Sequence, residues 1–355
     1  MLLRIAKAFS LVILQLEWLL KFSQANLKSF PKEGIRQQLW AFRKGFYLET
    51  INLCEITPRN VHEYISDKAY LKLHPINSEY SKMIDNKFFL PFLLKEYPEI
   101  VPKYYYLIDK GRLIKMDPEL PDDKGPLQLC KETLRLAIKP SSSTMGTGFY
   151  RLEWKDERFY LNNKPVEIQE FNSIIQSLDN YLVTEYVNQN KYAAEINPSS
   201  VNTVRLICLR HSSSNKFFIP ISFHRFGIEG KFVDNMGADG GGIVSYIDIQ
   251  TGQIRNINII KENGKLKKVI GDIKHPNSNK QITGIVIPNW AEMTNKVLTF
   301  LNNLSFLKYV GLDIVITEDG FKILEINSLP TLMGVQFEEG VFKDDKVKRF
   351  FQELK

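Results

Sequence analysis

Residues 311–327 read Gly-Leu-Asp-Ile-Val-Ile-Thr-Glu-Asp-Gly-Phe-Lys-Ile-Leu-Glu-Ile-Asn. Two apolar, β-branched runs flank residues 318–320, so the stretch predicts a β-hairpin with a three-residue loop. Gly320 supplies the residue that such a loop needs in the left-handed region. In this hairpin Thr317 pairs with Phe321, and that pair fixes the register of both strands.

Three oxygen-bearing side chains meet on one face of the predicted hairpin. Counting from the loop sets Asp313 opposite Glu325, and the two-residue period of a strand puts Asn327 on the same face. Two neighbouring carboxylates on an apolar sheet repel each other and lose hydration, so they require protonation or a cation. Mg²⁺ prefers oxygen ligands and commonly takes one or two carboxylates. The pattern therefore predicts a Mg²⁺ site; the alternative is a solvated hairpin rim.

Composition is that of an ordinary globular protein with two or three lobes. The 355 residues are 44% hydrophobic and 25% charged, and the net charge is +7. This excess of positive charge suits anionic ligands or an anionic membrane leaflet, and no nucleic-acid motif accompanies it. Cys54, Cys130 and Cys208 lack the spacing of a disulfide framework or a zinc site, which favours a reducing cytoplasm.

The first 80 residues predict a helical segment. Near the N-terminus, apolar residues recur at helical spacing: Ile5, Phe9, Val12, Leu16, Leu19 and Leu20. Glu17 and Lys21 interrupt the apolar run, which is too short to span a bilayer, so the pattern indicates an amphipathic helix rather than a signal peptide. Its apolar face either packs on the protein or lies in a membrane interface.

A second informative stretch begins at residue 135 with a strand that ends at Lys139. A loop rich in small hydroxyl residues and glycines follows: Ser141, Ser142, Ser143, Thr144, Gly146 and Gly148. Glycines let backbone N–H groups approach a phosphate closely, and the hydroxyls add donors. The lysine precedes the glycines, which excludes a Walker loop. The alternative is a flexible hairpin loop.

Two later strands carry polar residues among apolar neighbours. One strand covers residues 181–187 and contains Glu185; the next contains Arg205, whose burial is costly unless the guanidinium meets an anion. A structural ion pair with a neighbouring strand would also satisfy it. Residues 233–243 concentrate glycines and acids, which is typical of a mobile loop over a site or of a long surface turn.

This order of parts resembles the ATP-grasp superfamily, whose α+β fold consists of two lobes that clamp ATP between them. Four short segments are similar to the subgroup of sugar-transfer associated ATP-grasp proteins: residues 201–205, 233–235, 275–276 and 287–290. The helical pattern predicts a helical segment or cap over residues 1–80, and the resemblance, which covers roughly residues 86–334, implies a first lobe over 81–180 with the phosphate loop and a second lobe over 181–355 with the hairpin.

The resemblance also implies roles for individual residues. Lys87 and Lys139 would hold ATP phosphates, and the loop of residues 141–148 would close over them. The adenine hinge would be Glu185, Tyr186 and Val187, with Glu195 a ribose partner. Asp313, Glu325 and Asn327 would hold one or two Mg²⁺ ions, or Mn²⁺ in their place.

One departure concerns the catalytic arginine. Peptide-forming relatives often carry an arginine two residues before the first metal aspartate, for the tetrahedral intermediate, whereas this chain has Gly311. Arg205 or Arg225 would take over that role, or the reaction is not peptide formation.

The expected function is an ATP-dependent carboxylate–amine ligase that acts on a cell-surface polysaccharide, such as a capsule, or on its sugar precursor. One alternative is a kinase that phosphorylates a sugar or glycan hydroxyl. Another is a non-catalytic, nucleotide-binding partner of a glycosyltransferase. We expect an anionic sugar or glycan substrate, an amino acid or other amine as the second substrate, and no nucleic acid. We expect a cytoplasmic location; unless the N-terminal helix packs on the protein, it would contact the inner face of the membrane or a glycosyltransferase.

Overall fold

The computed structural model describes residues 16–24, 34–142, 146–234, 242–262 and 264–354. The chain divides into two compact units. One contains Pro75–Leu329, and the other contains Met1–His74 together with Pro330–Lys355. The three segments expected from the sequence, with boundaries at 80 and 180, stay predictions.

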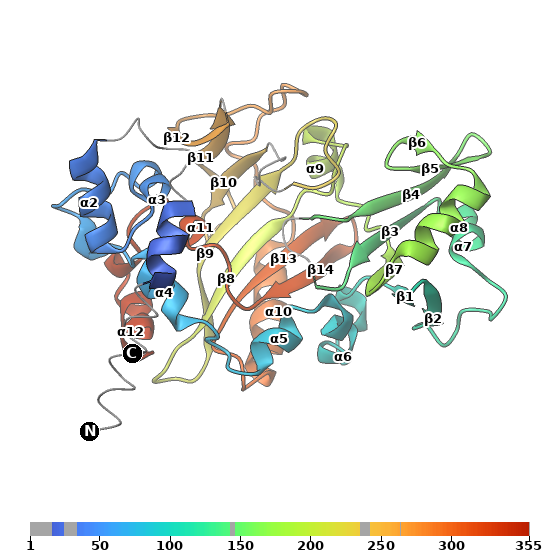
Figure 1. Cartoon of the computed structure of the whole chain (residues 1–355), viewed down its shortest axis with the longest axis horizontal. Helices are drawn as coiled ribbons and strands as arrows, with labels where there is room; N and C mark the ends of the chain where they lie inside the picture. Colours follow the sequence, from blue (N-terminus) through green and yellow to red (C-terminus); the bar gives the residue numbers. More distant parts are fainter. Residues whose placement is uncertain (1–15, 25–33, 143–145, 235–241, 263, 355) are drawn as a thin grey trace. The chain divides into compact units, whose positions relative to one another are not determined.

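The smaller unit is helical in its described part (Figure 1). Residues 16–24 form its first helix. The other elements are α2 (Ile35–Lys44), α3 (Leu48–Leu53), α4 (Asp67–Leu73), α11 (Leu332–Gln336) and α12 (Asp345–Glu353), with 3₁₀ turns at Val61–Glu63 and Val341–Lys343. The expected N-terminal helical segment is therefore present, although the expected helix positions Ile5, Phe9 and Val12 lie outside the described residues.

The larger unit contains two antiparallel sheets. The first follows the order β2 (Arg112–Lys115), β1 (Tyr104–Asp109), β7 (Tyr181–Glu185), β3 (Arg135–Pro140), β4 (Tyr150–Lys155), β5 (Arg158–Leu161) and β6 (Lys164–Pro165). Its alternating apolar residues, such as Leu136 and Ile138 of β3, pack against α7 (Pro126–Thr133) and α8 (Ile168–Ser177). The side chains at the alternate positions of β3, including Lys139, therefore point to the other face of the sheet.

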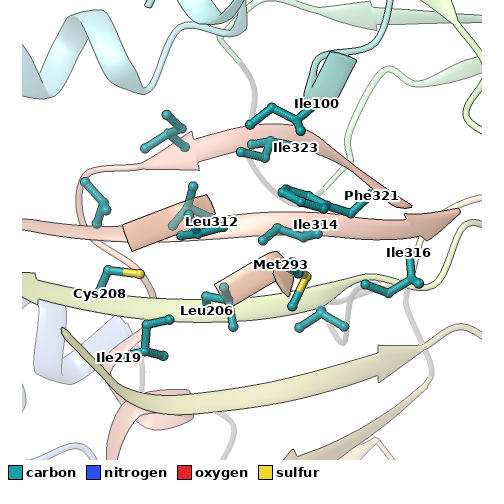
Figure 2. Packing of buried hydrophobic residues seen from close by; sticks show 14 of the residues in the cluster. Ile100, Leu206, Cys208, Ile219, Met293, Leu312, Ile314, Ile316, Phe321 and Ile323 are labelled. Atoms are coloured by element: carbon teal, nitrogen blue, oxygen red, sulfur yellow. The ribbon is translucent and has the colours of Figure 1, made fainter. Parts of the chain in front are cut away.

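The second sheet follows the order β12 (Lys265–Ile270), β11 (Ile254–Glu262), β10 (Ile243–Ile247), β9 (Phe217–Phe226), β8 (Val204–Arg210), β13 (Tyr309–Thr317) and β14 (Gly320–Asn327). One of its faces packs against α10 (Trp290–Asn303), as Figure 2 shows for Leu206, Leu312, Ile314 and Met293. Because side chains alternate, Arg205 and Asp313 lie on the opposite face. This opposite face carries the candidate site.

Shorter elements complete the larger unit. They are α5 (Tyr80–Ile84), α6 (Leu90–Leu93) and α9 (Lys191–Ile196), with 3₁₀ turns at Lys87–Phe89 and Pro98–Ile100. Tyr104 and Leu182, from the first sheet, belong to the same hydrophobic cluster as the second sheet. The two sheets and their helices confirm the α+β fold class.

Helix α10 begins without the side-chain cap that its sequence would allow. Asn289 followed three residues later by Glu292 is the pattern of a capping box. Asn289 does precede the helix, but its φ of 53° is left-handed and its side chain makes no capping hydrogen bond. Trp290 instead anchors the helix start, since its indole N–H donates to the Ile249 carbonyl at 2.8 Å.

Candidate active site

The loop of the β13–β14 hairpin is one residue shorter than the sequence predicts. Thr317 pairs with Gly320, not with Phe321, so only Glu318 and Asp319 form the loop. The register then shifts further along the ladder, where Leu324 has no partner. The extra residue of this β-bulge compensates for the residue that is missing from the loop.

The bulge restores the predicted pairing of the two carboxylates. Asp313 lies opposite Glu325, which confirms the register prediction at the site. The Asn327 amide donates to Glu325 Oε1 at 3.3 Å, so these two side chains share a face. The bulge also lets Ile323 and Ile326 both reach the core on the α10 side while Glu325 points away from it.

Asp313 is held between two arginines. Its Oδ2 accepts from Arg205 Nη2 at 2.8 Å and lies 2.7 Å from Arg225 Nη2, while its Oδ1 accepts from Arg205 Nε. Burial alone would raise the pKa of Asp313, but the charges of Arg205 and Arg225 outweigh burial and hold the pKa well below its ordinary value. Asp313 is therefore a fixed anion at neutral pH.

Arg225 extends this network to a residue that the sequence analysis does not select. Asp234 accepts from the Thr203 N–H at 2.7 Å and lies 3.6 Å from Arg225 Nε. Arg225 Nε also donates to Thr203 Oγ1 at 2.9 Å. Burial disfavours the charged form of Arg225, yet the carboxylates of Asp234 and Asp313 raise its pKa. The sequence signals for Asp234 are its place at the start of the glycine-rich loop, which also fits a surface turn, and its place in segment 233–235, which resembles the family but carries no assigned role.

Lys87 joins the other carboxylate of the hairpin. Its Nζ lies 2.8 Å from Glu325 Oε2, and its backbone N–H donates to the Ser141 carbonyl at 2.8 Å. The structure thus brings the predicted phosphate lysine, the predicted metal ligand and the start of the glycine loop together. These three residues are far apart in the sequence, and their roles in binding phosphate and metal stay predictions.

Lys139 lies on the face of the first sheet that points away from α7 and α8, and it is partly buried. Burial and the nearby charge of Lys87 lower its pKa to about 8, and Glu325 offsets part of that effect. Its Nζ also lies 5.9 Å from the centre of the Tyr104 ring. Lys139 is therefore a cation whose charge an incoming anion would stabilise.

The glycine loop approaches the loop that precedes β10. Gly146 and Gly148 both have positive φ, 68° and 79°, which glycine adopts readily. A Cβ at Gly146 would lie 2.7 Å from the Val233 side chain, so this close approach also requires glycine. Ser141 is buried beside Ser142, with 3.4 Å between their hydroxyl oxygens. Ser143 and Thr144 lie outside the described residues.

The predicted hinge follows β7. The Glu185 N–H donates to the Lys103 carbonyl at 2.8 Å, and Glu185 Oε2 accepts from the Lys103 N–H at 3.0 Å. Tyr186 and Val187 are buried. The guanidinium carbons of Arg135 and Arg151 lie 5.8 Å and 5.9 Å from the centre of the Tyr186 ring. The predicted hinge segment is thus hydrogen-bonded to Lys103 and largely buried, and its contacts with adenine stay a prediction.

A cavity lies near the predicted hinge, whereas Glu195 lies elsewhere. A cavity of about 370 Å³ is lined by Arg135, Arg151, Glu153 and residues 229–232, among others. Glu195, the predicted ribose partner, instead contacts surface lysines: its carboxylate lies 3.3 Å from Lys280 and 3.8 Å from Lys191. The structure therefore does not bring Glu195 to the other predicted site residues.

The oxygen donors of the hairpin fit a magnesium ion. Mg²⁺ needs only one or two carboxylates when substrate phosphates and water complete its coordination. Glu325 and Asn327 are partly exposed and offer carboxylate and amide oxygens on the same face. Asp313 is the less available ligand, because both of its oxygens already bind arginines. Within the described residues, no group of three or more His, Cys, Asp or Glu side chains forms a metal cluster.

The larger unit contains two antiparallel sheets, and lysines and a carboxylate pair lie between the predicted phosphate loop and the hairpin. These features define an ATP-grasp protein. The family described as Sugar-transfer associated ATP-grasp matches residues 68–349, and the chain belongs to it. Comparison with curated proteins gives no match.

Several solved structures are similar to the chain. D-alanine–D-alanine ligase from Bacillus anthracis is 13% identical, with a TM-score of 0.37 over 76% of this chain and 67% of that one. D-alanyl-alanine synthetase A from Vibrio cholerae is 11% identical, with a TM-score of 0.42 over 79% and 67%. N5-carboxyaminoimidazole ribonucleotide synthetase is 10% identical, with a TM-score of 0.37 over 70% of this chain and 46% of that one. The assignment rests on the family match.

Replacing Lys139 by methionine should weaken ATP binding about ten- to hundredfold, because a charge-assisted contact of roughly 1.5–3 kcal/mol is lost. The native affinity should also decline as pH rises through about 8, where Lys139 loses its proton. Calorimetry between pH 7 and pH 9 measures both effects. The exposed Lys164→Met change in β6 is the matched control. Equal affinities in the native chain and Lys139→Met would refute the assignment of Lys139.

Proposed function

We propose that the chain is an ATP- and Mg²⁺-dependent carboxylate–amine ligase. The observation that carries the proposal is the excess of cations at the hairpin. Lys87 binds Glu325, Lys139 lies within electrostatic range of both, and Arg205 and Arg225 bind Asp313. Even with Asp234 included, these four cations outnumber the three carboxylates that the described residues bring to this network. An uncompensated buried cation is costly, so the site favours an added anion such as the phosphates of ATP.

Three groups of residues would have separate roles in such a reaction. Lys87, Lys139 and the backbone of the glycine loop would hold the phosphates and neutralise charge as the γ-phosphoryl group moves. Glu325 and Asn327 would hold Mg²⁺, which supplies further charge neutralisation. Arg225, which is fixed by Asp234 and Asp313, would position an anionic substrate beside the γ-phosphate.

The bonds change in two steps. A carboxylate oxygen of the substrate attacks the γ-phosphorus and ADP leaves, which gives an acyl phosphate. An amine nitrogen then attacks the acyl carbon, an amide forms, and free phosphate leaves together with one proton from the amine. Exclusion of water between the two steps protects the acyl phosphate from hydrolysis.

The family description links the protein to sugar transfer, and on that link we propose an anionic sugar or glycan substrate of a surface polysaccharide such as a capsule. An amino acid or another amine would be the second substrate. The basic character of the site fits a uronic acid, because its carboxylate can both bind arginine and accept the phosphoryl group.

A kinase is the second candidate, and Gly311 is the observation that favours it. Gly311 lies opposite Asn327, so the position that carries an arginine in peptide-forming relatives has no side chain here. Arg205 and Arg225 reach Asp313 from the neighbouring strands and place guanidinium groups close by, which favours the ligase.

Phosphorus NMR of the product mixture separates the two reactions. We expect ADP and free phosphate in equal amounts, only when a uronic acid and an amine are both present, together with a new amide. The measurement uses the full chain with ATP, Mg²⁺ and a panel of uronic and amino acids. A stable phosphomonoester on the sugar, formed without any amine, would overturn the ligase assignment in favour of the kinase.

A further inference from the structure

Helix 16–24 of the smaller unit has two distinct faces. Trp18 is buried on one face, where its ring lies 6.4 Å from Phe42 of α2 and 5.2 Å from Tyr47. Phe22, one turn later, meets Phe42 edge-on at 5.3 Å. These aromatic contacts fix helix 16–24 on α2, so the packing that the sequence analysis left open does occur on this face.

The opposite face of the same helix is apolar and exposed. Leu16, Leu19 and Leu20 are 55%, 47% and 63% exposed. Positions three and four apart lie on one side of a helix, so these leucines project away from Trp18 and Phe22. On α2, Ile35 and Leu39 repeat the pattern and are 73% and 51% exposed. Two helices in contact with each other thus both present apolar side chains to solvent, which marks an interaction surface.

Basic residues accompany this apolar surface. The first 44 residues contain eight Lys and Arg against two Glu, a net charge of +6, while the whole chain carries +7. Lys21, Arg36, Arg43 and Lys44 are exposed, and within the described part of the chain none of them forms an ion pair. On α2, Arg36 and Arg43 are two turns apart and flank Ile35 and Leu39. Four exposed cations, Lys21, Arg36, Arg43 and Lys44, therefore lie on the same two helices as the exposed apolar side chains.

From these observations we infer that helix 16–24 and α2 form a docking face for a membrane surface rich in anionic lipids. Leucine and isoleucine side chains enter the boundary between headgroups and acyl chains, and the flanking Lys and Arg bind lipid phosphates. No helix in the described part of the chain is long and apolar enough to cross a membrane, so this contact lies at the surface. The core of a protein–protein interface, by contrast, is usually depleted of lysine.

Such a surface gives the enzyme access to substrates that are attached to lipids. Each of the two helices contributes only two or three apolar side chains, so binding needs both the apolar and the charged contacts. Binding should therefore be reversible, and it should weaken as salt screens the charges. This inference does not depend on the proposed reaction, because none of the docking residues lies in the candidate active site.

Flotation of the full chain with lipid vesicles tests the inference. We expect binding to vesicles of phosphatidylcholine that contain about one third phosphatidylglycerol, and at least about tenfold weaker binding to pure phosphatidylcholine. The double variant Leu16→Ser/Leu20→Ser and the double variant Arg36→Gln/Arg43→Gln should each reduce binding about tenfold or more. The matched control is Ile168→Ser/Ile270→Ser, which removes equally exposed apolar side chains from the larger unit. Circular dichroism confirms that each variant is folded.

Three results would overturn the inference. They are a failure of the native chain to float with anionic vesicles at low salt, binding that does not respond to salt or to phosphatidylglycerol, and binding that requires membrane proteins in the vesicles, which would identify a protein partner instead. All three are measured on the native chain, so a variant that fails to fold cannot rescue the proposal.

Discussion

Replacing Glu325 by glutamine should lower ATP turnover by about 10²–10⁴-fold and leave the chain folded, since a metal ligand typically supplies several kcal/mol of charge stabilisation in the transition state. Glutamine keeps the side-chain volume but removes the charge that faces Lys87 at 2.8 Å and that would face Mg²⁺. The Lys87 side chain is only 11% exposed, but the carbonyl oxygen of the glutamine can still accept a hydrogen bond from it. The loss should therefore appear in activity and not in stability.

Coupled ADP release and thermal unfolding on the same preparation measure the two effects. Glu170→Gln, an exposed change on α8, is the control and should alter neither quantity. A large fall in Tm with substantial residual turnover would instead assign Glu325 a structural role as the partner of Lys87.

The Asp313→Asn substitution, unlike Glu325→Gln, should lower the stability of the fold. We expect a loss of about 3–5 kcal/mol, because the substitution leaves two buried guanidinium groups without their shared anion. The side chains of Arg205 and Arg225 are only 10% and 15% exposed, so water cannot replace the carboxylate. Urea unfolding measures the change, and Asp319→Asn in the exposed loop of the same hairpin is the control.

Acid unfolding adds an independent test of the same ion pair. The pKa of Asp313 is lower in the folded chain than its ordinary value of 3.8, so the stabilisation is present above about pH 4 and is lost as pH falls further. Asp313→Asn should remove this part of the pH dependence. Identical acid-unfolding slopes in the native chain and the variant would contradict the proposed role of the arginine pair.

The local parts of the fold were predictable because they depend on nearby residues. Alternating apolar residues identify β13 and β14, and the strand ending at Lys139 is found as β3. The loop length was not predictable, since Glu318, Asp319 and Gly320 suit hairpin loops of two or three residues equally. Leu324 carries no sign of its bulge, because an apolar residue is acceptable on either strand face here.

The partners of Asp313 could not be predicted from spacing. Arg205 is 108 residues away and reaches Asp313 only because β8 lies beside β13, while Arg225 comes from β9. Strand order is a property of the whole chain and leaves no periodic signal in any one strand. The sequence therefore allowed an ion pair between Arg205 and a neighbouring strand, which the structure shows with Asp313, but it did not indicate that Arg225 shares the same anion.

The short loop and the bulge of the β13–β14 hairpin shift the strand register in opposite directions and cancel each other. One residue is missing at the turn and one extra residue is inserted at Leu324, so the pairing of Asp313 with Glu325 is unchanged. A hairpin with a three-residue loop and no bulge would pair the same two carboxylates. Relatives can therefore gain a residue at the turn if they lose one near Leu324. An alignment that treats these two length changes as one linked event would keep the paired acids in register.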